Sequence, residues 1–574
     1  MRYLALATDY DHTLAPGGRV APSTIKALER LKASGRKLIL VTGRQLESLL
    51  HVFPEYKVFD WLVVENGGLL YDPETGEETP LGDPPPQEMI DELQQRGVEY
   101  FDVGRTIINS WEPYQETILG IIKDLGLESQ VIFNKGAVMV LPSGVNKATG
   151  LLSALQKLGL SPHNVVAIGD AENDHAFLQL CEVSVAVANA LPMLKKQADW
   201  VTESGSGKGV VQVIEALLAD DLAEIAGRLK RHWLTLGTGQ DGQALRVQPY
   251  GKNVLVVGIP ASGKTTFALN FMEQLQKHEY QFTILDPEGD YQSLEDVVIL
   301  GSQEEPPVVE EVLELLRKTF DNCVVSSFGI QDSRRGDFFD ELWDPLLELR
   351  QEYGRPHWLL LDEAHQLMPS SKDASVYEAS KQTGQPLQSI FLISAFPDII
   401  APLVLESVDL VVAVGEDVED SLKLYCQAMD RPCPALPAFS SEQGEGLAWW
   451  TKTGESPVVF HLGNPKTKHK RHSRKYVEGD ISPEDSFYFV NPNDRNPIRA
   501  QNLMSFIDLS DQVSDETWMY HLKRGDYSRW VQEVIGDSEL AKEIGEVEQV
   551  QGISPKASRE KIRSAIEARY TRGR

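Results

Sequence analysis

The chain has 574 residues, 42% of them hydrophobic, and a formal net charge of −30 at pH 7. This length allows roughly three or four domains, and the hydrophobic fraction is sufficient for packed cores. The negative charge repels phosphate backbones over most of the surface, so it argues against a protein that coats DNA and disfavours nucleic acid as a partner.

The start of the chain and its cysteines narrow the class further. The N-terminus reads as a strand with an acidic loop rather than a signal peptide, and no apolar run reaches membrane-spanning length. We therefore expect a cytoplasmic protein with no membrane partner. Four cysteines occur without Cys-x-x-Cys spacing, so we expect free thiols in packed positions and neither zinc nor a disulfide framework: Cys181, Cys323, Cys426 and Cys433.

The first predicted strand, residues 3–7, is mostly apolar and leads into a loop that carries Asp9 and Asp11. In open α/β sheets, ligands bind at the carboxyl ends of the strands. Two acids one residue apart in extended backbone point the same way. Asp9 and Asp11 can therefore share a cation and act on one phosphorus atom.

Three later segments supply possible partners for this acidic pair. Residues 37–41 predict a second buried strand, which ends in Thr42-Gly43-Arg44, a hydroxyl and a tight turn suited to a phosphate oxygen. Lys147 opens a helical pattern, and residues 164–168 predict a third strand that releases the acidic loop 169–174. Three strand ends and one helix start can thus meet at one rim of the sheet.

On these motifs, residues 1 to about 220 resemble the Cof-type subgroup of the haloacid dehalogenase superfamily of phosphatases. The match continues through residues 185–190, 198–199 and 205–210. The resemblance implies that Asp9 is the nucleophile that attacks phosphorus, that Asp11 is the general acid/base, and that Thr42 and Lys147 clamp the phosphate.

The same resemblance implies a Mg²⁺ ion held by Asp9, Asp170, Asp174 and the backbone carbonyl of Asp11. The sequence departs from the family at His12, where glycine is usual. We expect the His12 imidazole to narrow the pocket or to shift Asp11.

Between Thr42 and Lys147 lie 104 residues, more than a crossover between strands needs. We therefore predict a small α+β cap over about 71–141, with strands at 106–109 and 137–140 and a helix near 115–124. Such a cap would exclude water and select the substrate. The alternative is that it only covers the sheet.

The best domain boundary is the glycine-rich polar stretch 235–243, which places the first domain at 1–222 and a linker at 223–248. Residues 253–257 then predict a buried strand that leads into Gly258-Ile259-Pro260-Ala261-Ser262-Gly263-Lys264-Thr265, a P-loop with a strand before it and a helix after it. Backbone N–H groups of this loop would face the phosphates, Lys264 would reach the outer phosphates, and Thr265 would bind Mg²⁺. The expected ATP-binding residues are Gly258, Ser262, Gly263, Lys264, Thr265, Thr266 and Asp362.

A second acidic pair, Asp362-Glu363, follows the apolar stretch 357–361 and suits a Walker B motif. Asp362 would orient the Mg²⁺ shell and Glu363 would polarise an attacking water, an arrangement that favours hydrolysis of ATP. Residues 249–462 resemble the HerA/FtsK-like branch of P-loop ATPases, with supporting residues at 263–266, 286–291 and 355–356.

This second resemblance weakens at the fourth strand. Ala395 stands where relatives carry an amide that senses the γ-phosphate, and Ser394 is the available substitute. Arg334 and Arg335 precede an amphipathic helix, where one of them either completes the site of a neighbour in a ring or lies at a solvated helix start. Both a monomer and a homo-oligomer are therefore compatible with the sequence.

The last segment, 463–574, is predicted as a basic linker followed by a helical module. Residues 464–475 hold six Lys/Arg and no acid, which is typical of a charged linker and less so of a contact with nucleic acid. Helical stretches are expected near 499–509, 516–523 and 527–535. Their aromatic residues predict either core packing or a docking surface: Trp518, Tyr520 and Trp530.

The predicted fold class is α/β, with two doubly wound parallel-sheet domains and a helical C-terminal module. The first domain would be Rossmann-like with the inserted cap, and the second a P-loop NTPase. The predicted function is a Mg²⁺-dependent phosphatase that hydrolyses a small phosphorylated metabolite through an aspartyl phosphate, fused to a domain that binds and hydrolyses ATP. The alternatives are a nucleic-acid end-processing or translocating ATPase with an attached phosphatase, and a nucleotide-gated scaffold.

Overall fold

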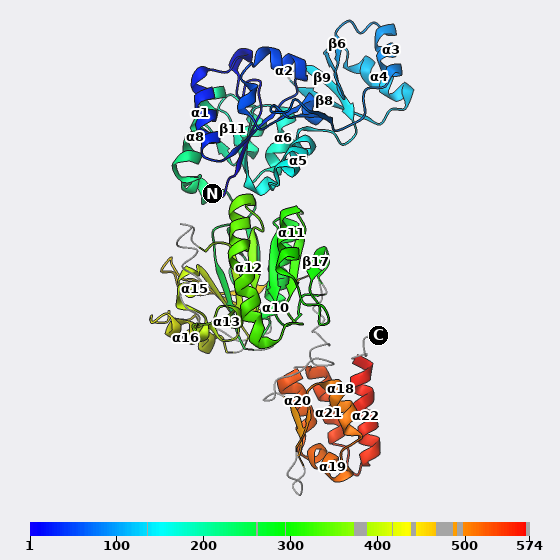
Figure 1. Ribbon diagram of the computed structural model, residues 1–574, viewed down its shortest axis with the longest axis vertical. Helices are drawn as coiled ribbons and strands as arrows, with labels where there is room; N and C mark the ends of the chain where they lie inside the picture. The colour runs from blue at the N-terminus through cyan, green and yellow to red at the C-terminus, as the bar shows by residue number, and fades with distance from the viewer. Residues whose placement is uncertain are drawn as a thin grey trace.

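The computed structural model describes residues 1–574 apart from 135, 260–261, 293, 319, 372–386, 416, 438–443, 466–485, 491–496, 536 and 570–574. The chain forms three bodies that follow one another along the long axis, with a smaller lobe projecting from the first (Figure 1). Within the described residues, no helix is both long and apolar enough to cross a bilayer. Most of the basic run 464–475 lies outside the described residues.

The first body is built on an eight-stranded sheet with strand order β12-β11-β10-β1-β2-β3-β4-β5. The six strands from β12 to β3 are parallel, and β4 and β5 add antiparallel to one edge. The strand bounds are β1 Ala5–Thr8, β2 Lys37–Val41, β3 Trp61–Val64, β4 Leu69–Tyr71, β5 Glu78–Pro80, β10 Val165–Gly169, β11 Val183–Ala186 and β12 Trp200–Val201.

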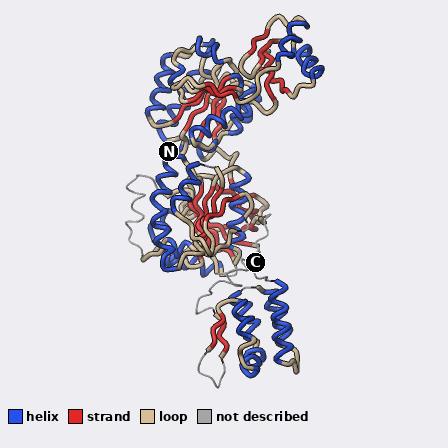
Figure 2. The backbone as a smooth tube through the Cα atoms, turned by 45° about the vertical axis from the view of Figure 1, so that its right-hand side comes forward, coloured by secondary structure: helices blue, strands red, loops and turns tan. Residues whose placement is uncertain are grey.

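Helices cover both faces of this sheet (Figure 2), which explains why β1 is buried at every position and apolar up to Thr8. Figure 1 shows α1 and α8 together on one side of it and α5 and α6 on the other. The helix bounds are α1 Pro22–Ala33, α2 Leu46–Val52, α5 Lys147–Leu158, α6 His175–Leu180, α7 Pro192–Gln197 and α8 Ser206–Asp220. The expected strands that carry Asp9, Thr42 and Asp170 are therefore confirmed.

The projecting lobe is the inserted α+β unit. Its antiparallel sheet has the order β6-β7-β9-β8, and the unit has a small core of its own. The bounds are α3 Gln87–Gln95, β6 Phe101–Val103, β7 Ile108–Trp111, α4 Gln115–Leu125, β8 Ser129–Asn134 and β9 Ala137–Pro142. The expected start near Tyr71 falls inside β4, which pairs with β3 in the first sheet, so the lobe begins after β5.

The second body contains an eleven-stranded sheet with the order β14-β13-β23-β22-β21-β15-β20-β19-β16-β18-β17. The seven strands from β21 to β17 are parallel. Alternate residues of the central strand, Val254–Val257, belong to two separate hydrophobic clusters, so both faces of the sheet are covered. The strand bounds are β13 Leu234–Gly239, β14 Ala244–Val247, β15 Val254–Val257, β16 Phe282–Asp286, β17 Val297–Leu300, β18 Asn322–Ser326, β19 Trp358–Leu361, β20 Ile390–Ser394, β21 Leu410–Val414, β22 Glu445–Trp450 and β23 Val458–Leu462.

The segment predicted as a linker, 223–248, differs from that expectation. Its glycine-rich part turns a β-hairpin, in which Gly239 donates to Gln243 and Gly242 donates to Gly239, and β13 then pairs with β23. The main helices of this body are α10 Lys264–Lys277, α11 Val309–Lys318, α12 Asp332–Tyr353, α13 Ala364–Leu367, α15 Pro402–Ser407 and α16 Val418–Ala428.

The third body packs helices around an aromatic core that includes Trp518 and Trp530. Core packing is therefore the role of these two aromatics, while Tyr520 stays half-exposed. The bounds are β24 Phe487–Phe489, β25 Ile498–Ala500, α18 Leu503–Ser510, α19 Asp515–Arg524, α20 Asp526–Trp530, α21 Ser538–Glu548 and α22 Pro555–Arg569. Cys181, Cys323 and Cys426 are buried free thiols, but Cys433 is exposed, contrary to its expected packed position.

Candidate active site

Three buried carboxylates meet at the carboxyl end of the first sheet. Asp9 follows β1, and Asp170 and Asp174 lie in the loop after β10. Each offers an oxygen, and these oxygens all lie within 4.8 Å of one another. All three side chains are buried. The structure therefore brings together three of the residues that the family resemblance implies as Mg²⁺ ligands.

Lys147, the first residue of α5, is the cation that faces this cluster. Its Nζ donates to Asp9 Oδ1 and to Asp174 Oδ1, each at 2.6 Å. Burial and the Asp174 carboxylate raise the pKa of Asp9 to about 8, against the opposing effect of Lys147. Burial alone would lower the pKa of Lys147, but Asp174 and Asp9 outweigh it and raise that pKa. The Asp174 carboxylate thus still acts on Asp9 although Lys147 pairs with both.

The loop after β10 is fixed by its own backbone. Asp174 Oδ2 accepts hydrogen bonds from the backbone N–H groups of Asp170 and Ala171, at 2.7 and 2.9 Å. A Cβ at Gly169 would lie 2.7 Å from the Asp174 Cβ, so only glycine lets the loop turn this tightly. Thr13 donates to Asp170 Oδ1 at 3.1 Å and links the loops after β1 and β10.

Asp11 lies at the mouth of the cluster and pairs with Arg44 rather than with Lys147. Arg44 donates from Nε to Asp11 Oδ2 at 2.7 Å and from its terminal nitrogen to Oδ1 at 2.8 Å. The Asp11 side chain is 39% exposed. Thr42 is buried, and its hydroxyl accepts from the Arg44 backbone N–H at 3.2 Å. Asp11, Thr42 and Arg44 therefore form one connected edge of the site.

His12 occupies a position with a φ of 62°, in the left-handed region that favours glycine. Its carbonyl accepts from Asn189 Nδ2 at 2.9 Å and from the Ser206 hydroxyl at 2.7 Å, which holds this backbone conformation. The His12 residue is exposed. This geometry gives the physical reason for the glycine that is usual there.

The inserted lobe touches the site at Met139 of β9. A Cβ at Gly43 would lie 3.4 Å from the Met139 Cε, so this turn is in contact with the lobe. A residue that the sequence reading missed anchors the lobe: the buried Glu65, just after β3, accepts from the backbone N–H groups of Arg105 and Thr106 at 2.9 and 2.8 Å. The pattern of an apolar strand followed by an acid, which singled out Asp9, also holds for Glu65.

The second acidic centre surrounds Lys264, the first residue of α10, which follows β15. The Lys264 Nζ donates to the backbone carbonyls of Gly258 and Ile259, at 2.8 and 3.0 Å. Burial lowers the pKa of Lys264, opposed by Glu363 and Asp362. Within the described residues, the buried Ser262 Oγ has no hydrogen-bond partner. Gly258, Gly263, Thr265 and Thr266 flank this lysine in the chain, and residues 260–261 lie outside the described part.

Asp362 and Glu363 follow β19 and face this lysine. Burial, together with Glu363 and Asp290, raises the pKa of Asp362 well above its usual value. His365 Nδ1 lies 3.2 Å from both Glu363 Oε2 and Ser394 Oγ, so Ser394 is linked to the acidic pair. Arg334 at the start of α12 is exposed.

Comparison with known proteins gives matches that cover about a third of the chain. Residues 6–108 and 106–214 match the model of the haloacid dehalogenase-like hydrolases. The phosphoglycolate phosphatase of Methanothermobacter thermautotrophicus is 30% identical over 222 residues, which cover 37% of this chain and 98% of that protein. Phosphoglycolate phosphatase 2 of Saccharolobus solfataricus is 28% identical over 227 residues, which cover 38% of this chain and 95% of that protein.

Among solved structures, a haloacid dehalogenase-like hydrolase from Bacteroides thetaiotaomicron has 20% sequence identity and a TM-score of 0.34, and the match covers 38% of this chain and 99% of that one.

Proposed function

Because this chain belongs, through residues 6–214, to the haloacid dehalogenase-like hydrolases, we propose that its N-terminal domain, a phosphatase of that superfamily, hydrolyses a phosphate monoester with Mg²⁺ through an aspartyl phosphate on Asp9. The observation that carries the proposal is the convergence of Asp9, Asp170 and Asp174 within 4.8 Å beside Lys147. The match covers 95% and 98% of the two phosphoglycolate phosphatases, so the domain has the full extent of such an enzyme.

The donor set of this cluster fits Mg²⁺. Three buried carboxylates offer oxygens within 4.8 Å of one another, and carboxylate oxygens are the ligands that Mg²⁺ prefers. Asp9, Asp170 and Asp174 would hold the ion together with the Asp11 backbone carbonyl. When bound, Mg²⁺ supplies positive charge that offsets the charge of the phosphoryl group.

The side chains divide the chemistry into two steps. In the first, an Asp9 oxygen forms a bond to phosphorus while the bond from phosphorus to the leaving oxygen breaks, and Asp11 gives that oxygen a proton. In the second, Asp11 takes a proton from water as the water oxygen attacks phosphorus, which releases inorganic phosphate and restores the Asp9 carboxylate. Thr42 and Lys147 bind the phosphoryl oxygens, and Arg44 positions Asp11 between turnovers.

The position of the inserted lobe favours a small substrate. It meets the rim of the site through Met139, so a bound substrate would lie between the lobe and the acidic cluster. Since two relatives carry the name phosphoglycolate phosphatase, 2-phosphoglycolate is the first compound to test.

For the second body we propose a site for ATP and Mg²⁺, with hydrolysis aided by Glu363. Support comes from the P-loop sequence between β15 and α10, from Lys264 at the start of that helix, and from the acidic pair after β19. The phosphates would take the place of the two carbonyl oxygens as partners of Lys264. A ring or other homo-oligomer stays a prediction.

An assay of phosphate release tests the phosphatase proposal. The full chain is incubated with an aryl phosphate, 2-phosphoglycolate and a sugar phosphate, with Mg²⁺ or with EDTA. Release from at least one compound in Mg²⁺, abolished by EDTA, is the expected result. Release that is equal in Mg²⁺ and in EDTA would contradict the proposal.

A further inference from the structure

A second cluster of metal-ligating side chains lies where the first body meets the second, away from the acidic site. His163 precedes β10, Glu182 precedes β11, and His232 comes from the segment that joins the two bodies. Each offers one ligand atom, and these atoms all lie within 4.8 Å of one another. His163 and Glu182 are buried, and His232 is half-buried.

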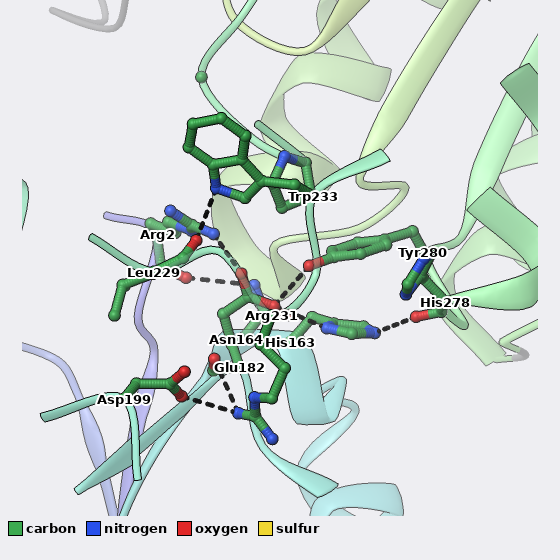
Figure 3. Close-up of polar contacts among 12 residues, drawn as sticks. Arg2, His163, Asn164, Glu182, Asp199, Leu229, Arg231, Trp233, His278 and Tyr280 are labelled. Atoms are coloured by element: carbon green, nitrogen blue, oxygen red, sulfur yellow. Dashed lines mark hydrogen bonds and ion pairs between the residues drawn. The ribbon is translucent and has the colours of Figure 1, made fainter. Parts of the chain in front are cut away.

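The second body contributes the outer partners of this cluster. The Tyr280 hydroxyl donates to Glu182 Oε2 at 2.6 Å, and the Tyr280 ring stacks on His163 with 3.8 Å between centroids. His163 Nε2 lies 2.7 Å from the backbone carbonyl oxygen of His278, just beyond α10. Figure 3 shows the Glu182 carboxylate with Tyr280 and His163 pointing at it, and Arg2 also contacts this carboxylate.

His163 and Glu182 approach each other so closely that a proton or a metal ion must lie between them. The His278 carbonyl can only accept, so His163 Nε2 carries the hydrogen, and Nδ1 lies 2.8 Å from Glu182 Oε2. Glu182 also pairs with Arg2, as a carboxylate does. A carboxylate oxygen and a ring nitrogen with a lone pair repel at this distance unless a proton or a metal ion lies between them.

His232 adds an independent observation. Its Nε2 is buried and has no hydrogen-bond partner among the described residues. The ring stands edge-on to His163, with 5.2 Å between centroids. A buried imidazole nitrogen without a partner, beside a carboxylate and another imidazole, has the character of a metal ligand.

We propose that His163 Nδ1, Glu182 Oε2 and His232 bind a zinc ion at the junction of the two bodies. Zinc favours imidazole nitrogen and carboxylate oxygen, and three protein ligands leave its fourth position for water. A metal-bound histidine usually donates its other N–H to a carbonyl, as His163 does to His278. On binding, the ion takes the place of the proton between His163 and Glu182, and that proton leaves to solvent.

A zinc ion at this site would connect the first body to the second. The ligand His163 stands before β10, which leads to Asp170, and the carbonyl on its far side follows α10, which begins at Lys264. The ion would therefore fix the end of one helix of the second body against the start of a central strand of the first. This inference does not depend on the activity of either body.

Zinc content measures the site directly. The tag-free full chain with Asp170→Asn, which weakens the acidic cluster as a competing site, is saturated with Zn²⁺, desalted and analysed by mass spectrometry of the metal. We expect about one zinc per chain, lost on adding His232→Ala. The matched control is His278→Ala, because the carbonyl that His163 contacts belongs to the backbone and is kept, and the His278 ring, edge-on to His232 with 6.3 Å between centroids, is not one of the three ligands. This variant keeps its zinc.

Thermal unfolding of the same proteins gives a second readout. Zn²⁺ should raise the unfolding midpoint of the Asp170→Asn protein and of the His278→Ala control, but not of the His232→Ala variant. If His232→Ala fails to fold, His163→Gln replaces it in both measurements. No zinc in the parent protein, or an equal zinc content with and without His232, would overturn the proposal.

Discussion

The Lys147 ammonium lies 2.6 Å from the Asp9 carboxylate, and both groups are buried. The same ammonium reaches Asp174 at the same distance. Lys147 thus pairs with two of the three carboxylates of the acidic cluster. We therefore expect Lys147 to contribute both to the free energy of unfolding of the first body and to its phosphatase activity.

Replacing Lys147 with methionine should therefore affect both. Removing one partner of a buried ion pair leaves an uncompensated charge, which costs about 3–5 kcal/mol. We expect this loss in the free energy of unfolding measured with urea in EDTA, and a smaller loss in Mg²⁺, because the ion supplies the missing positive charge. An equal loss under both conditions would contradict a shared electrostatic role.

Asp11→Asn should separate the two steps of the reaction. An aryl leaving group needs little help from an acid, so Asp9 would still be phosphorylated, whereas the following hydrolysis loses its base. With p-nitrophenyl phosphate we expect a burst of about one nitrophenol per chain, then a steady rate lower by ~10²–10⁴-fold. The rapid-mixing progress curve checks this, and a linear curve at the full rate would exclude the assigned role.

Glu65→Ala should loosen the inserted lobe. The substitution leaves the backbone N–H groups of Arg105 and Thr106 without their acceptor, at a cost of about 1–3 kcal/mol in the free energy of unfolding. We also expect a higher KM, since the lobe would close less well over the substrate. Glu47→Ala is the control, because the exposed Glu47 pairs with the Arg105 side chain and not with its backbone N–H. Equal effects of the two substitutions would argue against the anchor.

The ATP site is tested in an Asp9→Asn background, so that the phosphatase does not consume the nucleotide. By calorimetry, Lys264→Ala should weaken ATP binding by a factor on the order of 10–100, equivalent to one charge-assisted hydrogen bond of about 1.5–3 kcal/mol. Glu363→Gln should keep the affinity and lose hydrolysis. Unchanged ATP affinity after Lys264→Ala would rule out the P-loop as the site.

Most of the acidic site could be predicted from the sequence because its signal is local. Asp9 and Asp170 each follow an apolar strand, and parallel strands bring their carboxyl ends to one edge of the sheet. Arg44 was visible beside Thr42, but its pairing with Asp11 depends on how two loops face each other. No fixed spacing along the sequence predicts such a contact between two loops.

Apart from Glu65, which has the same local pattern as Asp9, the features that the sequence does not reveal are long-range. The glycine-rich stretch 235–243 has the composition of a linker, and only its pairing with β23, far along the chain, makes it part of the second sheet. His163, Glu182 and His232 have no motif spacing, and the outer partners of this cluster come from the second body. Burial of cysteines also depends on packing, which is why Cys433 was misplaced.

The central claim is that Asp9 is the nucleophile of a Mg²⁺-dependent phosphatase. The most direct measurement compares phosphate release by the full chain with Asp9→Asn and by a control with Asp83→Asn, an exposed carboxylate in the same part of the chain. The account predicts that Asp9→Asn lowers the rate in Mg²⁺ by at least about a thousandfold, with ATP affinity unchanged, and that Asp83→Asn keeps the full rate. Full activity of the Asp9→Asn protein would contradict it.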